Sequence, residues 1–185
     1  MTLESSQHLI MPRVIKKTER TIERSGFHER IAKVIARAGI CSRREAERRI
    51  AEGRVKIDGK VISTPAVKVS PTDKILIDDS PLPAPTPYRL WRYYKPNGLL
   101  TTECDPQGRP TIFDNLPKSL PRLISVGRLD LNSEGLLLMT NNGDLARRLE
   151  LPSTNWRRRY RARVHGQVNP KLLNELKDGI KIDGI

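Results

Sequence analysis

The residues whose types and spacing could do chemistry lie in segment 126–140. Gly127, Arg128 and Asp130 are followed by a polar turn at 132–135 and by an apolar run at 136–140, which predicts a buried strand. Positions two apart share one face of an extended chain, so Arg128 could pair with Asp130 and keep its carboxylate ionised. On spacing alone, a structural ion pair beside a turn is the favoured interpretation. The alternative is an anionic nucleophile on a loop that leaves a rigid sheet.

The sequence carries no other catalytic pattern. We find no Ser-His-Asp set, no paired-carboxylate spacing and no phosphate-cradling glycine loop. The cysteines, Cys41 and Cys104, are far apart and the three histidines are isolated, so we expect no metal site. Thiols in this arrangement predict a reduced, cytoplasmic protein.

The elements that must position Asp130 are short. Residues 88–94 predict a strand with aromatic character, 95–98 a break, and 124–126 the strand that enters the key segment. Asp144 is expected to cap a helix at 145–149, and 170–177 predict another helix. Residues 160–164 predict a strand. The arginines of 157–163 would alternate faces along one strand. One face could follow a nucleic-acid backbone, or the charges could protect a sheet edge from pairing.

Charge restricts the class of partner. The 185 residues carry 34 Lys and Arg against 21 Asp and Glu, a formal net charge of +13. The pI is about 10.2 and the mean hydropathy is -0.52. A chain this basic usually meets a polyanion, and the lack of a long apolar run excludes a membrane-spanning helix. No apolar core of signal-peptide length begins the sequence, so nothing favours secretion.

The pattern divides the chain into four segments. Residues 1–26 predict a basic mobile tail, with an arm that gains order on RNA as the alternative. In 27–79, apolar period predicts a helix from Ile31, and Ser42 with Glu45 predicts a capping box for a second helix at 43–51. The turn Asp58-Gly59 predicts a hairpin. Alternating prolines at 80–87 predict a semi-rigid linker, and 88–185 form the last segment.

Basic residues of the first module predict a phosphate-contacting surface, since arginine forks match phosphate oxygens and release counterions. The alternative is a solvated face partly neutralised by nearby glutamates. Lys95, in the later segment, could contact phosphate or be a solvated turn lysine. The candidate RNA-binding residues are Arg30, Lys33, Arg37, Arg43, Arg44, Arg48, Arg54 and Lys95.

Residues 27–79 resemble a known RNA-binding module. Segments 31–39, 42–46, 53–55 and 58–59 are similar to the S-four RNA-binding domain, which is named for a small-subunit ribosomal protein. The resemblance implies RNA binding through the two-helix face, without chemistry of its own.

Residues 88–185 resemble the catalytic domain of bacterial ribosomal RNA pseudouridine synthases. The resemblance rests on segments 93–98, 105–111, 113–114, 127–138 and 159–166, and it is strongest to the large-subunit branch, synthase B. It implies an α+β chain: a small two-helix plus hairpin RNA-binding domain, then a mixed or antiparallel-sheet synthase domain, which we expect to be truncated at its C-terminus because a third basic motif of the family is missing.

The implied activity is isomerisation of a uridine to pseudouridine in a folded stem-loop of large-subunit ribosomal RNA, without metal or cofactor. Asp130 would be the catalytic aspartate, Tyr160 would stack on the target base, and Arg128 would orient or neutralise nearby groups. We expect a cytoplasmic monomer. Two alternatives stay open: a non-catalytic RNA-binding protein or inactive synthase fragment, and, with less support, a basic ribosome assembly factor.

Overall fold

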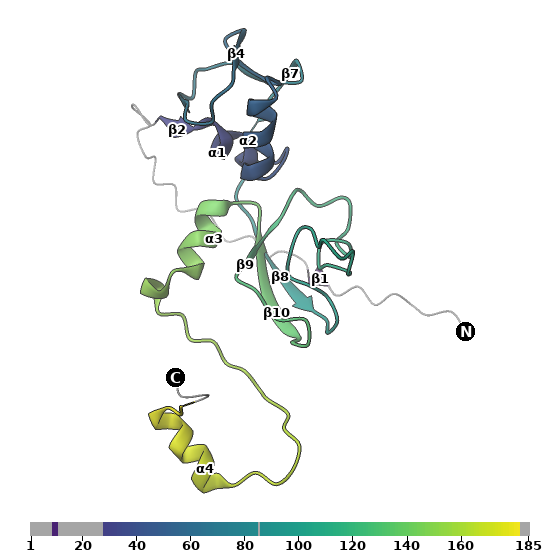
Figure 1. Ribbon diagram of the computed structural model, residues 1–185, viewed down its shortest axis with the longest axis vertical. Coiled ribbons are helices and arrows are strands. Elements are labelled where there is room, and N and C mark those ends of the chain that lie inside the picture. Colours follow the sequence, from purple (N-terminus) through teal and green to yellow (C-terminus); the bar gives the residue numbers. More distant parts are fainter. Residues whose placement is uncertain (1–8, 11–27, 85, 182–185) are drawn as a thin grey trace, which may run out of the picture. The chain divides into compact units, whose positions relative to one another are not determined.

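The computed structural model describes residues 9–10, 28–84 and 86–181. The chain divides into two compact units, Met1–Thr154 and Asn155–Ile185. The first unit contains an N-terminal module of two helices with small antiparallel sheets, followed by a four-stranded antiparallel sheet with one helix (Figure 1). Among the described residues, no helix is both long enough and apolar enough to cross a membrane.

The N-terminal module forms as its local signals predict. Helix α1 covers Ile31–Arg37 and helix α2 covers Arg43–Ala51. The Ser42 side chain accepts a hydrogen bond from the Glu45 amide at 3.1 Å, as the capping pattern requires. Asp58 and Gly59 both have positive φ, 48° and 81°, which suits the tight turn between β3 (Val55–Ile57) and β4 (Lys60–Ile62).

The sheets of this module contain more strands than the predicted hairpin. β3 pairs with β6 (Ile75–Ile77), which pairs with β7 (Ser80–Pro81), and β2 (Glu29–Arg30) pairs with β5 (Lys68–Val69). Because β7 belongs to the sheet and Leu82 packs on the module's core, the module reaches into the segment predicted as a linker from residue 80.

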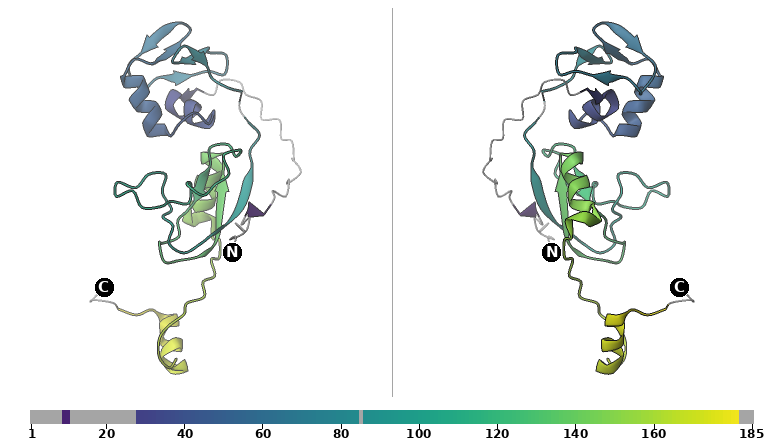
Figure 2. Two further views of the ribbon diagram at one scale, coloured as in Figure 1. Left: turned by 90° about the vertical axis from the view of Figure 1, so that its right-hand side faces the viewer. Right: turned by 90° about the vertical axis from the view of Figure 1, so that its left-hand side faces the viewer.

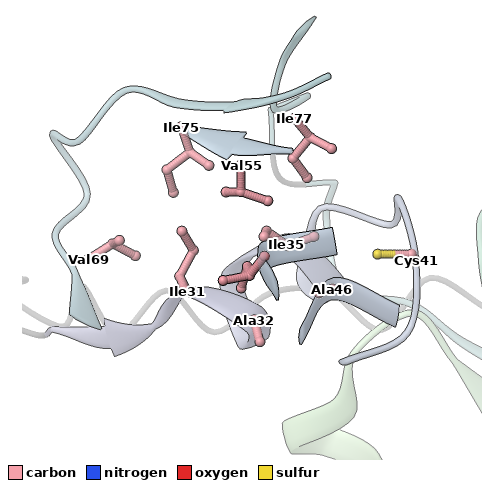
Figure 3. Packing of buried hydrophobic residues seen from close by; sticks show 10 residues of the cluster. Ile31, Ala32, Ile35, Cys41, Ala46, Val55, Val69, Ile75 and Ile77 are labelled. Carbon is pink, nitrogen blue, oxygen red and sulfur yellow. The ribbon is translucent and has the colours of Figure 1, made fainter. Parts of the chain in front are cut away.

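The core of the N-terminal module lies between the helices and the sheet. Ile31 and Ile35 of α1 and Val55 of β3 are fully buried. Figure 3 shows Val55 on the strand side facing the helix-borne Ile31 and Ile35. Burying each such side chain contributes about 1.5–3 kcal/mol. These contacts fix the two helices and thus the basic side chains they carry.

The second sheet has the strand order β1-β8-β10-β9, all neighbours antiparallel. The bounds are β8 Leu90–Lys95, β9 Ile124–Val126 and β10 Gly135–Thr140. β1 (Leu9–Ile10) pairs with β8, so these two residues of the predicted 1–26 tail form an edge strand, while the rest of that segment lies outside the described residues. Trp91 and Tyr93 bury one face of β8 against Leu137 and Met139 of β10.

Helix α3, Gly143–Glu150, packs on β9 and β10, and both views of Figure 2 show it lying along the sheet. Its N-cap is Asn142, whose Oδ1 accepts from the Leu145 amide at 2.7 Å, so the prediction of Asp144 as the cap is wrong. Asp144 instead pairs with Lys33 of α1 at 2.8 Å. A short 3-10 turn, η1 (Pro152–Thr154), ends the first unit.

The second unit contains α4 (Pro170–Glu175) and the 3-10 turn η2 (Leu176–Asp178), close to the helix predicted at 170–177. The strand predicted at 160–164 is not present; these residues are exposed and have no regular structure. A strand needs a hydrogen-bonded neighbour, and the described part of this unit supplies none. The prediction of arginines alternating along a strand at 157–163 is wrong for the same reason.

Candidate active site and RNA-binding surface

Asp130 lies on the loop between β9 and β10. The loop starts at Gly127, whose φ of 72° turns the chain sharply out of β9, a conformation that favours glycine. Leu129 packs partly against the apolar core of the sheet, while Asp130 is exposed. The alternation of an anchored apolar residue and an exposed carboxylate directs Asp130 toward solvent at the end of the sheet.

The side chain of Lys95 fixes this loop through hydrogen bonds. It is fully buried, and Nζ donates hydrogen bonds to the carbonyl oxygens of Asp130 at 2.9 Å, Ser133 at 2.8 Å and Pro96 at 3.1 Å. A weaker fourth contact reaches the Leu131 carbonyl at 3.5 Å. One ammonium group therefore binds the carbonyl of Asp130 and the carbonyls of residues 131 and 133, which follow it in the loop.

Three further groups fix the same loop. The Thr101 hydroxyl donates to the Leu129 carbonyl at 2.7 Å and accepts from the Leu129 amide at 3.3 Å. The Gly98 amide donates to the Leu131 carbonyl at 2.9 Å. The Gly127 amide donates to Glu150 Oε1, at the end of α3, at 2.7 Å. We call Lys95, Gly98, Thr101 and Glu150 the loop cradle.

The loop cradle binds main-chain atoms and leaves the carboxylate of Asp130 open. Among the described residues, that carboxylate makes no hydrogen bond and no ion pair. Burial lowers the pKa of Lys95, and the charge of Asp130 acts in the opposite direction. A carboxylate without a partner, on a backbone that is already held in place, suits an attacking group. The entropy cost of orienting it is met during folding, before the substrate binds.

Two predictions about this loop are corrected by the structure. Arg128 and Asp130 lie on an irregular loop after the strand at 124–126, so they do not share a strand face, and the described ion pairs include none between them. Arg128 is exposed, so it stays available to another group. Lys95, predicted as a phosphate contact, is instead buried and fully engaged with carbonyl oxygens, because it continues the inward face of β8 begun by Trp91 and Tyr93.

Tyr160 belongs to the second unit, where it is 69% exposed. Its phenol ring is therefore free to contact a base, but its stacking role stays a prediction. Among the described residues, no group of three His, Cys, Asp or Glu side chains is arranged to hold a metal ion.

Acidic neighbours neutralise half of the predicted RNA-binding residues. Arg48 donates twice to Glu45, both at 2.9 Å, and Arg54 donates twice to Asp78 at 2.6 and 2.7 Å. The hydrogen bonds from Arg48 and then Arg49 lower the pKa of Glu45 to about 2. Surface pairs of this kind contribute little to stability, but they reduce the charge that a phosphate meets.

Glu29 neutralises part of α1. It pairs with Lys33 at 3.1 Å and with Arg37. Burial acts to raise the pKa of Glu29, but the hydrogen bonds and charges of Lys33 and Arg37 lower it below its ordinary value. In the described structure, three of the predicted arginines have no ion pair: Arg30, Arg43 and Arg44, all exposed. These three are the arginines of the module most available to an RNA phosphate.

Comparison with known proteins matches both parts of the chain to families. Residues 29–75 match the S4 domain, and residues 89–183 match the family described as RNA pseudouridylate synthase. This chain belongs to the RNA pseudouridylate synthase family. The fold class and the two resemblances predicted from the sequence are thereby confirmed.

Members of the synthase family resemble the chain along most of its length. An uncharacterized RNA pseudouridine synthase of Rickettsia felis is 52% identical over 162 residues, which cover 85% of this chain and 68% of that protein. The ribosomal large subunit pseudouridine synthase B of Salmonella typhi is 47% identical over 161 residues, which cover 84% of this chain and 55% of that protein. The chain thus spans little more than half of the latter.

A solved structure, described as a pseudouridylate synthase, is 31% identical and has a TM-score of 0.35. The matched part covers 64% of this chain and 51% of the chain of that structure.

Within the synthase segment, sequence reasoning missed Thr101 and Glu150. Their partners lie 28 and 23 residues away, and no local pattern marks such contacts.

Proposed function

We propose that the chain isomerises a uridine of ribosomal RNA to pseudouridine, with Asp130 as the attacking carboxylate and without a cofactor. The observation that carries the proposal is the exposed Asp130 on a loop whose backbone is fixed by the loop cradle, in a chain of the synthase family. The name of the Salmonella typhi relative supports the large ribosomal subunit as the source of the RNA.

The reaction is an exchange of bonds within one nucleotide. The bond from uracil N1 to the ribose anomeric carbon breaks, and a bond from uracil C5 to that carbon forms. The hydrogen on C5 leaves, and N1 gains one, so no oxidant or other reactant is needed. The carboxylate of Asp130 attacks either the anomeric carbon or the uracil ring, and it leaves again when the new bond forms.

The partner and the state of the protein follow from the same proposal. The S4 domain binds a folded RNA stem-loop through α1 and α2, with Arg30, Arg43 and Arg44 on phosphates. Tyr160 stacks on the target base once it leaves its helix. Arg128 orients or neutralises the reacting groups. We propose that the protein acts as a cytoplasmic monomer; Cys41 and Cys104 are free thiols, as a reducing compartment requires.

Tritium release from unmodified large-subunit ribosomal RNA, labelled at uridine C5, tests the proposal. We expect release by the wild-type chain and none by Asp130→Asn, with RNA affinity unchanged. Glu134→Gln is the matched control, because it removes an exposed carboxylate from the same loop and should keep its activity. Equal release by Asp130→Asn would rule out Asp130 as the attacking carboxylate. No release by the wild type alongside tight binding would leave RNA binding as the supported function.

A further inference from the structure

A cleft of about 340 Å³ lies within the first compact unit, between the S4 domain and the synthase segment. Helices α1 and α2 form one wall, and β9 with α3 forms the other. Five basic side chains line it: Lys33, Arg37, Arg43, Arg122 and Arg147. The cleft therefore gathers cations from two domains, and this arrangement is distinct from the loop that carries Asp130.

Ion pairs neutralise three of these five cations. Lys33 pairs with Asp144 at 2.8 Å, Arg37 pairs with Glu29, and Arg122 pairs with Glu103. Glu150, the remaining acid of the lining, accepts from the Gly127 amide at 2.7 Å. The acidic groups of the cleft thus already have partners within the protein.

Two guanidinium groups are left over. Arg43 of α2 and Arg147 of α3 have no ion pair among the described residues, and both are exposed. Arg43 reaches across to the start of α3: its Nη2 atom lies 3.9 Å from where a Cβ on Gly143 would be. The N-terminus of α3 carries partial positive charge, which Asp144 in its first turn offsets only in part, so the position beside Arg43 favours an anion.

The chemistry of the lining selects the ligand. Apart from its charged side chains, the cleft is lined by small or polar residues such as Ala36, Ala146 and Asn141 and by the apolar Ile124. The surplus of basic side chains favours a phosphate, which guanidinium groups bind through paired hydrogen bonds. A volume of about 340 Å³ is at the small end for ligand sites, so it fits one strand at a time.

We propose that this cleft binds the phosphate backbone of the RNA substrate, with Arg43 and Arg147 on neighbouring phosphates. The S4 domain and the synthase segment then hold one stretch of RNA together. This inference rests on the proposed function only in taking RNA as the partner. It does not depend on catalysis by Asp130.

Arg147 and Arg148 provide a matched test. They are adjacent exposed residues of one helix with equal charge, and only Arg147 lines the cleft. The affinity of a labelled RNA hairpin with a uridine-rich loop is measured between 50 and 300 mM salt for the whole chain. We expect Arg147→Gln to lower the slope of log affinity against log salt by roughly 0.7–0.9, and Arg43→Gln with Arg147→Gln to lower it by about twice that amount.

Arg148→Gln should leave the slope unchanged within about 0.2. Equal effects of Arg147→Gln and Arg148→Gln, no effect of Arg147→Gln, or no binding by the wild type would each overturn the inference. Circular dichroism melting of every variant shows that the fold is retained. If the wild type binds as expected but releases no tritium, the proposed catalysis fails while the cleft stands.

Discussion

Replacing Lys95 by methionine separates a structural from an RNA-binding role. Lys95 is fully buried, and three of its hydrogen bonds, to Pro96, Asp130 and Ser133, are 3.1 Å or shorter. Methionine has similar length and can fill the space, but it donates no hydrogen bond. The Asp130 carbonyl then keeps the Ser133 amide as a donor at 3.0 Å, whereas the Ser133 carbonyl loses the Lys95 ammonium group.

The expected loss of stability follows from the count of these bonds. Hydrogen bonds from a charged donor contribute roughly 1.5–3 kcal/mol each, so three such bonds give a gross loss of roughly 4.5–9 kcal/mol. Methionine also removes the cost of burying an ammonium group, several kcal/mol, and the exposed loop at Asp130 admits water to the freed carbonyls. We expect a net destabilisation of about 2–4 kcal/mol.

Urea unfolding measures this loss. Trp91, 2% exposed, reports on the core of the sheet, and replacing the 63% exposed Trp156 by phenylalanine removes the second signal. With a slope of about 2 kcal/mol/M, Lys95→Met should lower the midpoint by about 1–2 M and leave the salt slope of RNA binding unchanged. Lys118→Met, which removes an exposed lysine, is the control.

The opposite pattern for Lys95→Met would refute the reasoning. Such a pattern is an unfolding midpoint within about 0.2 M of the wild type together with a salt slope lower by roughly 0.7–0.9. It would identify Lys95 as a phosphate contact and contradict a buried, structural role.

Three further predictions concern single hydrogen-bond donors or acceptors. Thr101→Val should lower kcat by about 10-fold with KM unchanged and speed exchange of the Leu129 amide, whereas Thr101→Ser should restore both; a changed KM alone would argue against a positioning role. Ser42→Ala should cost about 1 kcal/mol in thermal unfolding, since it removes the cap on the Glu45 amide. Hydrogen bonds from Arg109 hold the pKa of Asp105 at about 2 against 3.8, so their stabilisation is complete above pH 3.8 and is lost as the pH falls to about 2; a carboxyl carbon titrating near 3.8 by NMR would contradict this.

The N-terminal module was predictable because its signals are local. The helix at 43–51 follows from Ser42 and the apolar period, and the hairpin follows from Asp58-Gly59. The short strands β2, β5 and β7 were not predicted. Two residues carry too little pattern to show a strand, and their pairing depends on the packed core that the longer elements form.

The synthase segment shows where local signals mislead. The sequence Lys95-Pro96 ends the strand and indicates a surface turn, and the charge of the lysine side chain favours an exposed position. Yet Lys95 lies two and four positions after Tyr93 and Trp91, so the period of the strand turns it inward. Its partners lie 35 and 38 residues away, and only the closed sheet brings them together. The strand predicted at 160–164 failed for a related reason, since strand propensity does not supply a neighbouring strand.

The charge of the chain shows most clearly what sequence and structure each contribute. A formal net charge of +13 predicts a polyanionic partner but does not say which cations are free to meet it. Glutamates three or four positions away neutralise Arg48, and Asp78, which follows the neighbouring strand β6, neutralises Arg54 within the N-terminal module. Arg147, which sequence reasoning did not select, lines the same cleft as Arg43 and has no ion pair with the part of the chain that the structure describes. The strength of RNA binding should therefore follow the unpaired arginines rather than the total charge, because a paired guanidinium must give up one anion to bind another.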